Sequence, residues 1–195
     1  MTPRAFGEPQ PLPLTIVLRQ GATLARQGEP GDGLWLVEAG ALRTSMVTND
    51  GRELTLDVLG PGDAAGEPFG VVSGADVRTL RQTRLRPLDP RAAADLLAAR
   101  AHRAAALAAE LAWVGVQERV AWRLDDLAER FGRPVEGGTL LVLPLTQDEL
   151  AALAGTSRES VSRALRALVS EGRIRVPAKG RYVVRSRLHA VEAAR

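Results

Sequence analysis

Three charged side chains that form directional hydrogen bonds, Arg158, Glu159 and Arg163, lie close together in the last quarter of the chain. An arginine can donate two hydrogen bonds to guanine O6 and N7, and a glutamate can accept one from cytosine N4. The apolar residues of this segment recur at helical spacing, which places the three charged side chains on the opposite, outward face of a helix. These apolar residues are Val161, Leu165, Leu168 and Val169. The segment therefore has the chemistry needed to recognise the edges of base pairs.

A second group of side chains is suited to phosphate oxygens, since hydroxyl groups near helix N-termini and lysines on loops commonly contact nucleic-acid backbones. We expect this role for Thr146, Ser157, Ser160, Ser162 and Lys179. Taken singly, each of these residues, like the three charged ones, is better explained as part of a solvated surface. Their interpretation depends on the elements that carry them.

The surrounding residues predict two helices joined by a tight turn. Thr146 and Glu149 have the spacing of a capping box, in which each side chain bonds the backbone N–H of the other residue. Gly155 supplies the turn, and Ser157 caps a second helix of about 14 residues that ends at Gly172. A short helix, a turn containing glycine and a longer helix together are typical of a helix-turn-helix.

A hairpin is predicted after the second helix. Residues 174–176 and 182–184 favour strands, and the segment 177–181 between them contains proline, glycine and two basic residues. A hairpin of this kind is a wing, and it would carry Lys179 at its tip.

The charges of the chain separate along the sequence. Residues 1–143 contain 16 basic and 18 acidic residues, whereas residues 144–195 contain ten basic and five acidic residues. A basic segment attached to a nearly neutral body is typical of a domain that binds nucleic acid.

Composition excludes several other chemistries. The chain has no cysteine, so it lacks disulfides, thiolate metal sites, cysteine-ligated iron–sulfur clusters and cysteine nucleophiles. Its two histidines are too few for a multi-histidine metal site, and residues 1–101 contain none, which argues against a cupin-type enzyme. No P-loop, dinucleotide-binding fingerprint or Ser-His-Asp set is present. We therefore expect neither a metal site nor an enzyme.

The sequence also lacks the signals of membrane insertion and export. No run of about 18 apolar residues occurs, and the N-terminal segment has no apolar stretch of a secretory signal. We expect a cytoplasmic protein that does not enter the membrane.

The first half of the chain predicts a small antiparallel β-structure. Proline-rich residues 1–13 suggest an extended arm, and from residue 15 to residue 88 short apolar runs alternate with glycine-containing turns. The clearest strands are residues 34–37, 41–47 and 53–59. Many short strands with regular turns favour a barrel, roll or sandwich.

A long helical segment follows at residues 91–131, which contain no proline and many good helix formers. Leu107, Leu111 and Val114 form one apolar stripe, and a second stripe displaced in phase begins at Val116. Gly115 lies between the stripes and predicts a bend. The leucine stripe would suit a parallel partner helix, so we expect a homodimer with these residues at its interface. The alternative is that this face packs on the β-structure.

The sequence from Leu145 to Ile174, LTQDELAALAGTSRESVSRALRALVSEGRI, resembles the winged helix-turn-helix of the cyclic-AMP receptor/fumarate-nitrate regulator (CRP/FNR) family of bacterial transcription factors. Residues 28–43, GEPGDGLWLVEAGALR, resemble the β-roll of the same family. The resemblance implies an α+β fold with a shortened N-terminal antiparallel β-roll, a long dimerisation helix and a C-terminal winged helix-turn-helix. The corresponding domains are residues 1–90, 91–115 and 116–195.

This resemblance implies a sequence-specific regulator of transcription, and we expect an activator. Its partners would be double-stranded DNA, RNA polymerase and a second copy of the chain. Arg158, Glu159 and Arg163 would read a half-site of TGTGA type, and the dimer would address two such half-sites related by two-fold symmetry.

The resemblance also locates a possible effector site in the roll. In members that bind cyclic nucleotides, a Gly-Glu pair holds the ribose and a later Arg-Ser pair holds the phosphate. Gly66-Glu67 matches the first pair, and Arg78-Thr79 is a candidate for the second.

Two departures argue against nucleotide binding. Pro68 removes a backbone donor, and alanines occupy positions 104 and 105, where adenine-contacting hydroxyls would lie. We therefore expect DNA binding without cyclic AMP and no cofactor, with Glu67 and Arg78 acting as ion-pair residues. The roll would then serve in dimerisation and polymerase contact. The alternative is a regulator switched by a cyclic nucleotide.

Overall fold

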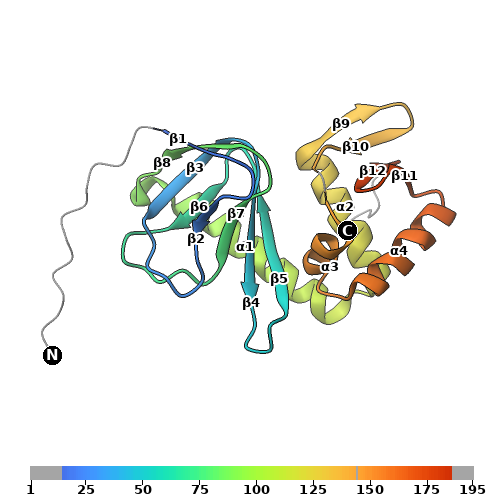
Figure 1. Ribbon diagram of the computed structural model, residues 1–195, viewed down its shortest axis with the longest axis horizontal. Coiled ribbons are helices and arrows are strands. Elements are labelled where there is room, and N and C mark those ends of the chain that lie inside the picture. The colour runs from blue at the N-terminus through green and yellow to red at the C-terminus, as the bar shows by residue number, and fades with distance from the viewer. Residues whose placement is uncertain (1–14, 144, 186–195) are drawn as a thin grey trace, which may run out of the picture.

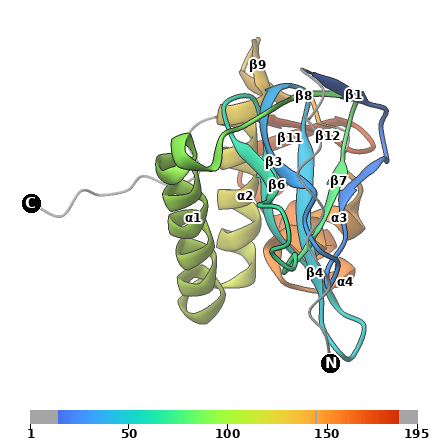
Figure 2. The same cartoon turned by 90° about the vertical axis from the view of Figure 1, so that its left-hand side faces the viewer.

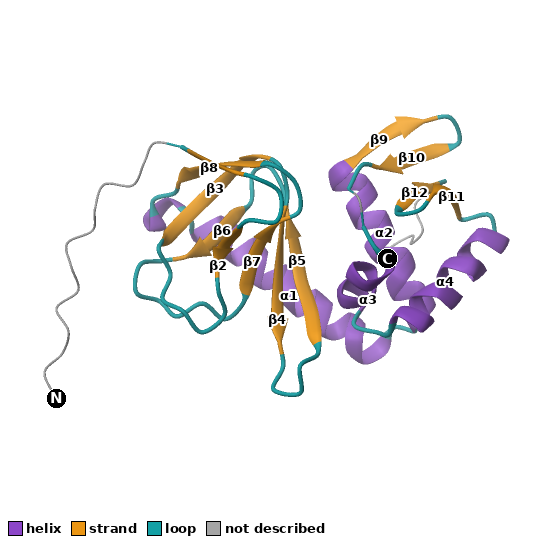
Figure 3. Ribbon diagram, in the orientation of Figure 1, coloured by secondary structure: helices purple, strands orange, loops and turns teal. Residues whose placement is uncertain are grey.

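The computed structural model describes residues 15–143 and 145–185, and the predicted arm at residues 1–13 lies outside this range. A β-roll is followed by a long helix that runs along it into a smaller C-terminal unit (Figure 1). Figure 3 shows how the strands gather in the first part and most helices in the second. The expected order of roll, long helix and winged helix-turn-helix is confirmed.

The roll consists of two four-stranded antiparallel sheets, with strand orders β1-β8-β3-β6 and β2-β7-β4-β5. Trp35, Val37, Leu42, Leu59 and Leu85 are buried between them. The three predicted strands correspond to β3, β4 and β5. The strands are β1 (Ile16–Leu18), β2 (Thr23–Ala25), β3 (Gly33–Ala39), β4 (Leu42–Val47), β5 (Glu53–Leu59), β6 (Ala64–Glu67), β7 (Asp76–Thr79) and β8 (Thr83–Pro87).

Two helices follow the roll, and the second belongs to the core of the C-terminal unit. After a short 3-10 turn (Pro90–Ala92), α1 (Ala94–Trp113) runs along one side of the roll, and α2 (Val116–Phe131) follows (Figure 2). Gly115, the N-cap of α2, has the extended backbone angles φ −63° and ψ 153°. The predicted bend at this glycine is thus observed.

The leucine stripe of α1 faces its own chain. Helix α1 packs against β5 and β6, Leu107 is buried, and Leu111 lies close to Gly155. Burial within one chain leaves little of Leu107 for a partner, whereas Leu111 and Val114 are half-buried. The expectation that these three residues lie at a dimer interface stays a prediction.

The C-terminal unit contains two further helices and one four-stranded antiparallel sheet of order β11-β12-β10-β9. Leu124, Leu127, Leu150, Leu168 and Tyr182 form the middle of its core. The hairpin β9–β10 was not among the sequence predictions. The elements are β9 (Gly132–Val135), β10 (Gly138–Leu141), α3 (Gln147–Ala154), α4 (Arg158–Ser170), β11 (Ile174–Ala178) and β12 (Arg181–Val184).

An ion-pair cluster joins the roll to both connecting helices. Arg103 of α1 donates to Asp57 at 2.6 Å and to Asp63 at 3.0 Å. Arg130 of α2 contacts the same two carboxylates at 3.4 and 2.9 Å. Because Asp57 and Asp63 are largely shielded from water, these attractions are stronger than surface ion pairs. The four residues, called the clasp below, fix α1 and α2 on the roll.

Arg119 of α2 joins separate segments of the chain inside the C-terminal unit. Its side chain donates to the carbonyls of Val114 at 2.6 Å and Ala154 at 2.9 Å, and to that of Gly155 at 3.5 Å. The residue is only 9% exposed. It thereby connects the bend after α1 with the end of α3.

No helix in residues 15–143 and 145–185 is long and apolar enough to cross a membrane.

Candidate nucleic-acid interface

Helices α3 and α4 form the predicted helix-turn-helix. The capping box is present, since Glu149 N–H donates to the Thr146 hydroxyl and the Glu149 carboxylate accepts from Thr146 N–H. Gly155 ends α3 with φ +57°, and a Cβ there would lie 2.4 Å from the Leu111 side chain. The left-handed backbone therefore favours glycine, and a Cβ at this position would also force the Leu111 side chain to move. The Ser157 hydroxyl accepts from Ser160 N–H and caps α4.

The side chains expected to read bases project from the first half of α4 into solvent. Arg158 has 63% of its side chain exposed, and its ion pair with Asp148 spans 4.0 Å, which makes it weak. Arg163 is exposed and donates to the Ser160 hydroxyl at 2.9 Å, so its guanidinium is partly oriented. Both arginines are available to an incoming ligand.

Glu159 is exposed at the N-terminus of α4. Hydrogen bonds from its own backbone N–H and then from Ser157 lower the pKa of its carboxyl group. The side chain is therefore ionised at neutral pH and acts only as an acceptor. This is the protonation state that recognition of a cytosine amino group requires.

The residues expected to contact phosphates differ in their availability. The Thr146 hydroxyl donates to Glu149 at 2.8 Å, so its hydrogen is already used in the cap. Ser157 and Ser160 bond to each other, and Ser162 is half-buried beside them. Lys179 is exposed at the tip of the β11–β12 wing. Lys179 is the one charged residue of this set, and its side chain is open to solvent.

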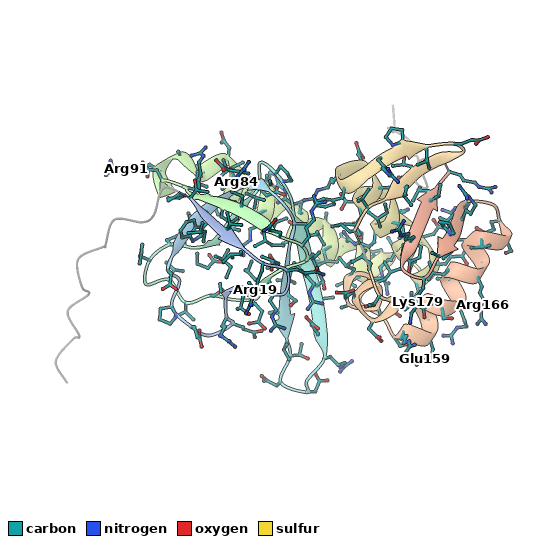
Figure 4. The ribbon with its side chains drawn as sticks, turned by 45° about the horizontal axis from the view of Figure 1, so that its top comes forward. Arg19, Arg84, Arg91, Glu159, Arg166 and Lys179 are labelled. Carbon is teal, nitrogen blue, oxygen red and sulfur yellow. The ribbon has the colours of Figure 1, made fainter. Side chains whose placement is uncertain are left out.

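A groove of about 850 Å³ separates α4 from the wing. Arg158, Ser162 and Arg166 line it from α4, and Lys179 lines it from the opposite side. Figure 4 shows Glu159, Arg166 and Lys179 together at the same end of the molecule. Arg166, which also lines the groove, was not among the expected contacts. Val169 was wrongly predicted to be buried, because it borders this groove and is 45% exposed.

The two residue pairs of the possible effector site bond different partners. Glu67 bonds Arg100 of α1 at 2.9 Å, and the same guanidinium donates to the Gly66 carbonyl at 3.2 Å. Arg78 lies in β7 and donates to Thr23 at 3.2 Å, while the Thr79 hydroxyl donates to the Arg19 carbonyl at 2.7 Å.

The expectation that Glu67 and Arg78 are ion-pair residues therefore holds for Glu67 only. Arg78 bonds a hydroxyl because its strand position directs it to β2. Between the two pairs, residues 68–75 form turns and contain no helix.

The geometry defines a protein that binds DNA through a winged helix-turn-helix and carries a β-roll beside it. A family of Crp-like helix-turn-helix domains matches residues 118–190, and a family of cyclic nucleotide-binding domains matches residues 15–100. The chain belongs to the CRP/FNR family of transcription regulators.

Curated relatives agree with this assignment. A CRP-like cAMP-activated global transcriptional regulator of Mycobacterium tuberculosis is 36% identical over 178 residues, covering 82% of this chain and 79% of the relative. The cyclic AMP receptor protein of Thermus thermophilus is 35% identical over 174 residues, covering 80% and 77%. Among solved structures, a CRP/FNR-family transcriptional regulator from Thermus thermophilus has a TM-score of 0.76 at 28% identity, covering 89% of this chain and 94% of its own.

Proposed function

We propose that this regulator binds a two-fold symmetric, TGTGA-like DNA site as a dimer and activates transcription without cyclic AMP, through contact with RNA polymerase. Residues 1–90 would form the effector-type domain with its arm, residues 91–115 the dimerisation helix and hinge, and residues 116–195 the DNA-binding domain. The observation that carries the proposal is the exposed face of α4, where Arg158, Glu159 and Arg163 project beside a basic wing.

The chemistry of this face supports a half-site that contains G·C pairs. Two exposed arginines can each bind guanine O6 and N7, and one ionised glutamate can bind cytosine N4. Since α4 has 13 residues, it is about 20 Å long and fits a major groove.

Arg100 supports activity without cyclic AMP. Its guanidinium occupies both Glu67 and the Gly66 carbonyl, so a ligand hydroxyl would have to displace a 2.9 Å ion pair that is about four-fifths shielded from solvent. The clasp adds support, because its ion pairs join α1 and α2 directly to the roll. The names of the relatives favour the alternative, since two of them refer to cyclic AMP.

Titration with cyclic AMP distinguishes regulation without cyclic AMP from regulation that depends on it. Isothermal titration calorimetry is expected to detect no binding at micromolar concentrations, and 100 μM cyclic AMP, on the order of a hundred times such a Kd, should leave the DNA affinity unchanged. Micromolar binding that tightens DNA affinity would establish the cyclic-nucleotide-dependent alternative.

The exposed face of α1, opposite the leucine stripe, is suited to form the dimer interface. Family members typically act as dimers, and six alanines recur on the exposed side of α1 at alternating spacings of four and three residues. This is the a/d pattern of a coiled coil, and the small side chains would allow close helix approach. Trp113, 88% exposed, lies next to the last alanine. The six are Ala94, Ala98, Ala101, Ala105, Ala108 and Ala112.

Placing a charge in this seam should break the dimer. Ala105→Glu is expected to convert the protein to monomer at micromolar concentration in sedimentation velocity, since two glutamates would meet at the axis. Ala92→Glu, also exposed but before α1, is the matched control and should remain dimeric. A dimeric Ala105→Glu variant would exclude the alanine seam.

Lys179→Ala should weaken binding to all DNA sequences to a similar degree. A phosphate contact carries no base information, so the slope of log K against log salt should fall by about one while the preferred sequence is retained. Fluorescence anisotropy on specific and random duplexes at several salt concentrations measures both quantities. A changed sequence preference would show that Lys179 contacts bases.

A further inference from the structure

The groove between α4 and the wing changes in character along its length. Beside the start of α3 it is lined by Arg158, Ser162 and Asp148. At the last turn of α4 it is lined by Val169 and Val176. Val169 lies about 16 Å along the helix axis from Arg158. The groove therefore has a polar end and an apolar end.

DNA does not account for the apolar end. Val169 and Val176 are both exposed, and Leu165 continues the apolar surface inward between them. The second helix of a helix-turn-helix contacts base edges with its N-terminal residues, and phosphate oxygens offer nothing to a valine. Sites for small molecules are typically apolar hollows with a few polar groups. The groove, about 850 Å³ in volume, has this composition.

A buried hydroxyl group without a partner also lines the groove. Tyr182 is only 2% exposed, and no residue in the described part of the chain hydrogen-bonds its hydroxyl. Burial raises the pKa of this phenol, so it keeps its proton at neutral pH and can donate. Since buried polar groups are normally hydrogen-bonded, Tyr182 is suited to donate to an acceptor bound in the groove.

The charges that line the groove favour an anion. Arg166 and Lys179 lie on opposite walls, and within residues 15–143 and 145–185 neither forms an ion pair with a carboxylate. Asp148 also lines the groove, but its 4.0 Å ion pair is with Arg158. Two cations thus remain for the head group of a ligand.

We propose that this groove binds a carboxylic acid with an unbranched apolar tail, and that the bound acid excludes DNA. The carboxylate would bind Arg166 and Lys179 and accept from the Tyr182 hydroxyl, while the tail would cover Val169 and Val176. DNA is excluded because Lys179 cannot bind the acid and a phosphate together. This exclusion rests on the proposed function, whereas binding of the acid does not.

Isothermal titration calorimetry with decanoate, in the absence of DNA, tests the site. Decanoate is expected to bind at least about tenfold more tightly than acetate, which has no tail, and than 1-decanol, which has no charge. Equal binding of all three, or no binding of decanoate, would overturn the proposal.

Variants locate the ligand in the groove. Val169→Asn should weaken decanoate binding about tenfold, because it removes apolar surface from the tail. Tyr182→Phe should weaken it to a similar degree through loss of the hydroxyl. The matched control is Val142→Asn, at a valine that is 46% exposed against 45% for Val169 but does not line this groove. It should bind decanoate as wild type does. Unchanged binding by Val169→Asn would exclude the groove.

Competition measures the effect on DNA. At about ten times the Kd of decanoate, the Kd of wild-type protein for its DNA site should rise about tenfold, while Val169→Asn should keep its DNA affinity. Acetate at the same concentration controls for ionic strength. Decanoate binding with unchanged DNA affinity would overturn the exclusion. Wild-type protein without any preferred DNA site would instead refute the proposed function, and the calorimetry would still decide whether the groove binds the acid.

Discussion

Replacing Arg158 with alanine is expected to weaken binding to the preferred site by about 10- to 100-fold, because one bidentate contact to guanine contributes roughly 1–3 kcal/mol. The side chain is exposed at the N-terminal end of α4, and its ion pair with Asp148 is too weak to withhold it from DNA. Removing the side chain should therefore change the stability of the free protein little. The effect should appear as lost DNA affinity together with relaxed base preference at one position of each half-site. Arg163→Ala should act similarly at a second position.

Arg26→Ala is a close control for this experiment. Arg26 is likewise 63% exposed and forms a 4.0 Å ion pair, with Glu29, but it lies in the roll. The variant removes the same charge and the same kind of surface contact, so it should retain affinity and specificity. Competition binding against duplexes with single base changes measures both. If Arg158→Ala kept the base preference of the wild type, α4 would not be the recognition helix in this orientation.

Replacing Arg119 with methionine is expected to lower the free energy of unfolding by about 3 kcal/mol. Methionine matches the length of the aliphatic stem but leaves the carbonyls of Val114 and Ala154 without their donor, and an unsatisfied buried polar group costs about 1–3 kcal/mol. Urea unfolding followed by circular dichroism measures the loss. Glu129→Met, an exposed position on the same helix, should change stability by no more than about 0.5 kcal/mol.

Arg119→Met should also weaken DNA binding, because Arg119 helps to orient the helix-turn-helix. Arg119 joins the end of α1 to the turn of the helix-turn-helix, so its loss frees the bend at Gly115. A stability equal to that of wild type would mean that other donors or water satisfy these carbonyls.

The helix-turn-helix was predictable because its signals are local. A capping box, a glycine at positive φ and a serine N-cap each act within one turn of helix, and each is found where the sequence places it. The same holds for the main strands of the roll, which are bounded by glycine turns.

The features that were missed depend on residues far apart in the chain. Hairpin β9–β10 is stabilised by pairing with β12, which lies more than 40 residues later, and its own residues do not alternate regularly. The leucine stripe of α1 could face a partner or the roll, and periodicity cannot distinguish the two. Arg100 reaches Glu67 across 33 residues, so the occupation of that carboxylate becomes visible only in the folded chain.

Selection of bound sequences from a pool of random duplexes, with and without cyclic AMP, tests whether a dimer reads DNA through α4. We expect enrichment of a two-fold symmetric site with TGTGA-like halves about 34 Å apart, one helical turn, and the same site in both conditions. A pool that remains random after repeated rounds in both conditions would contradict it.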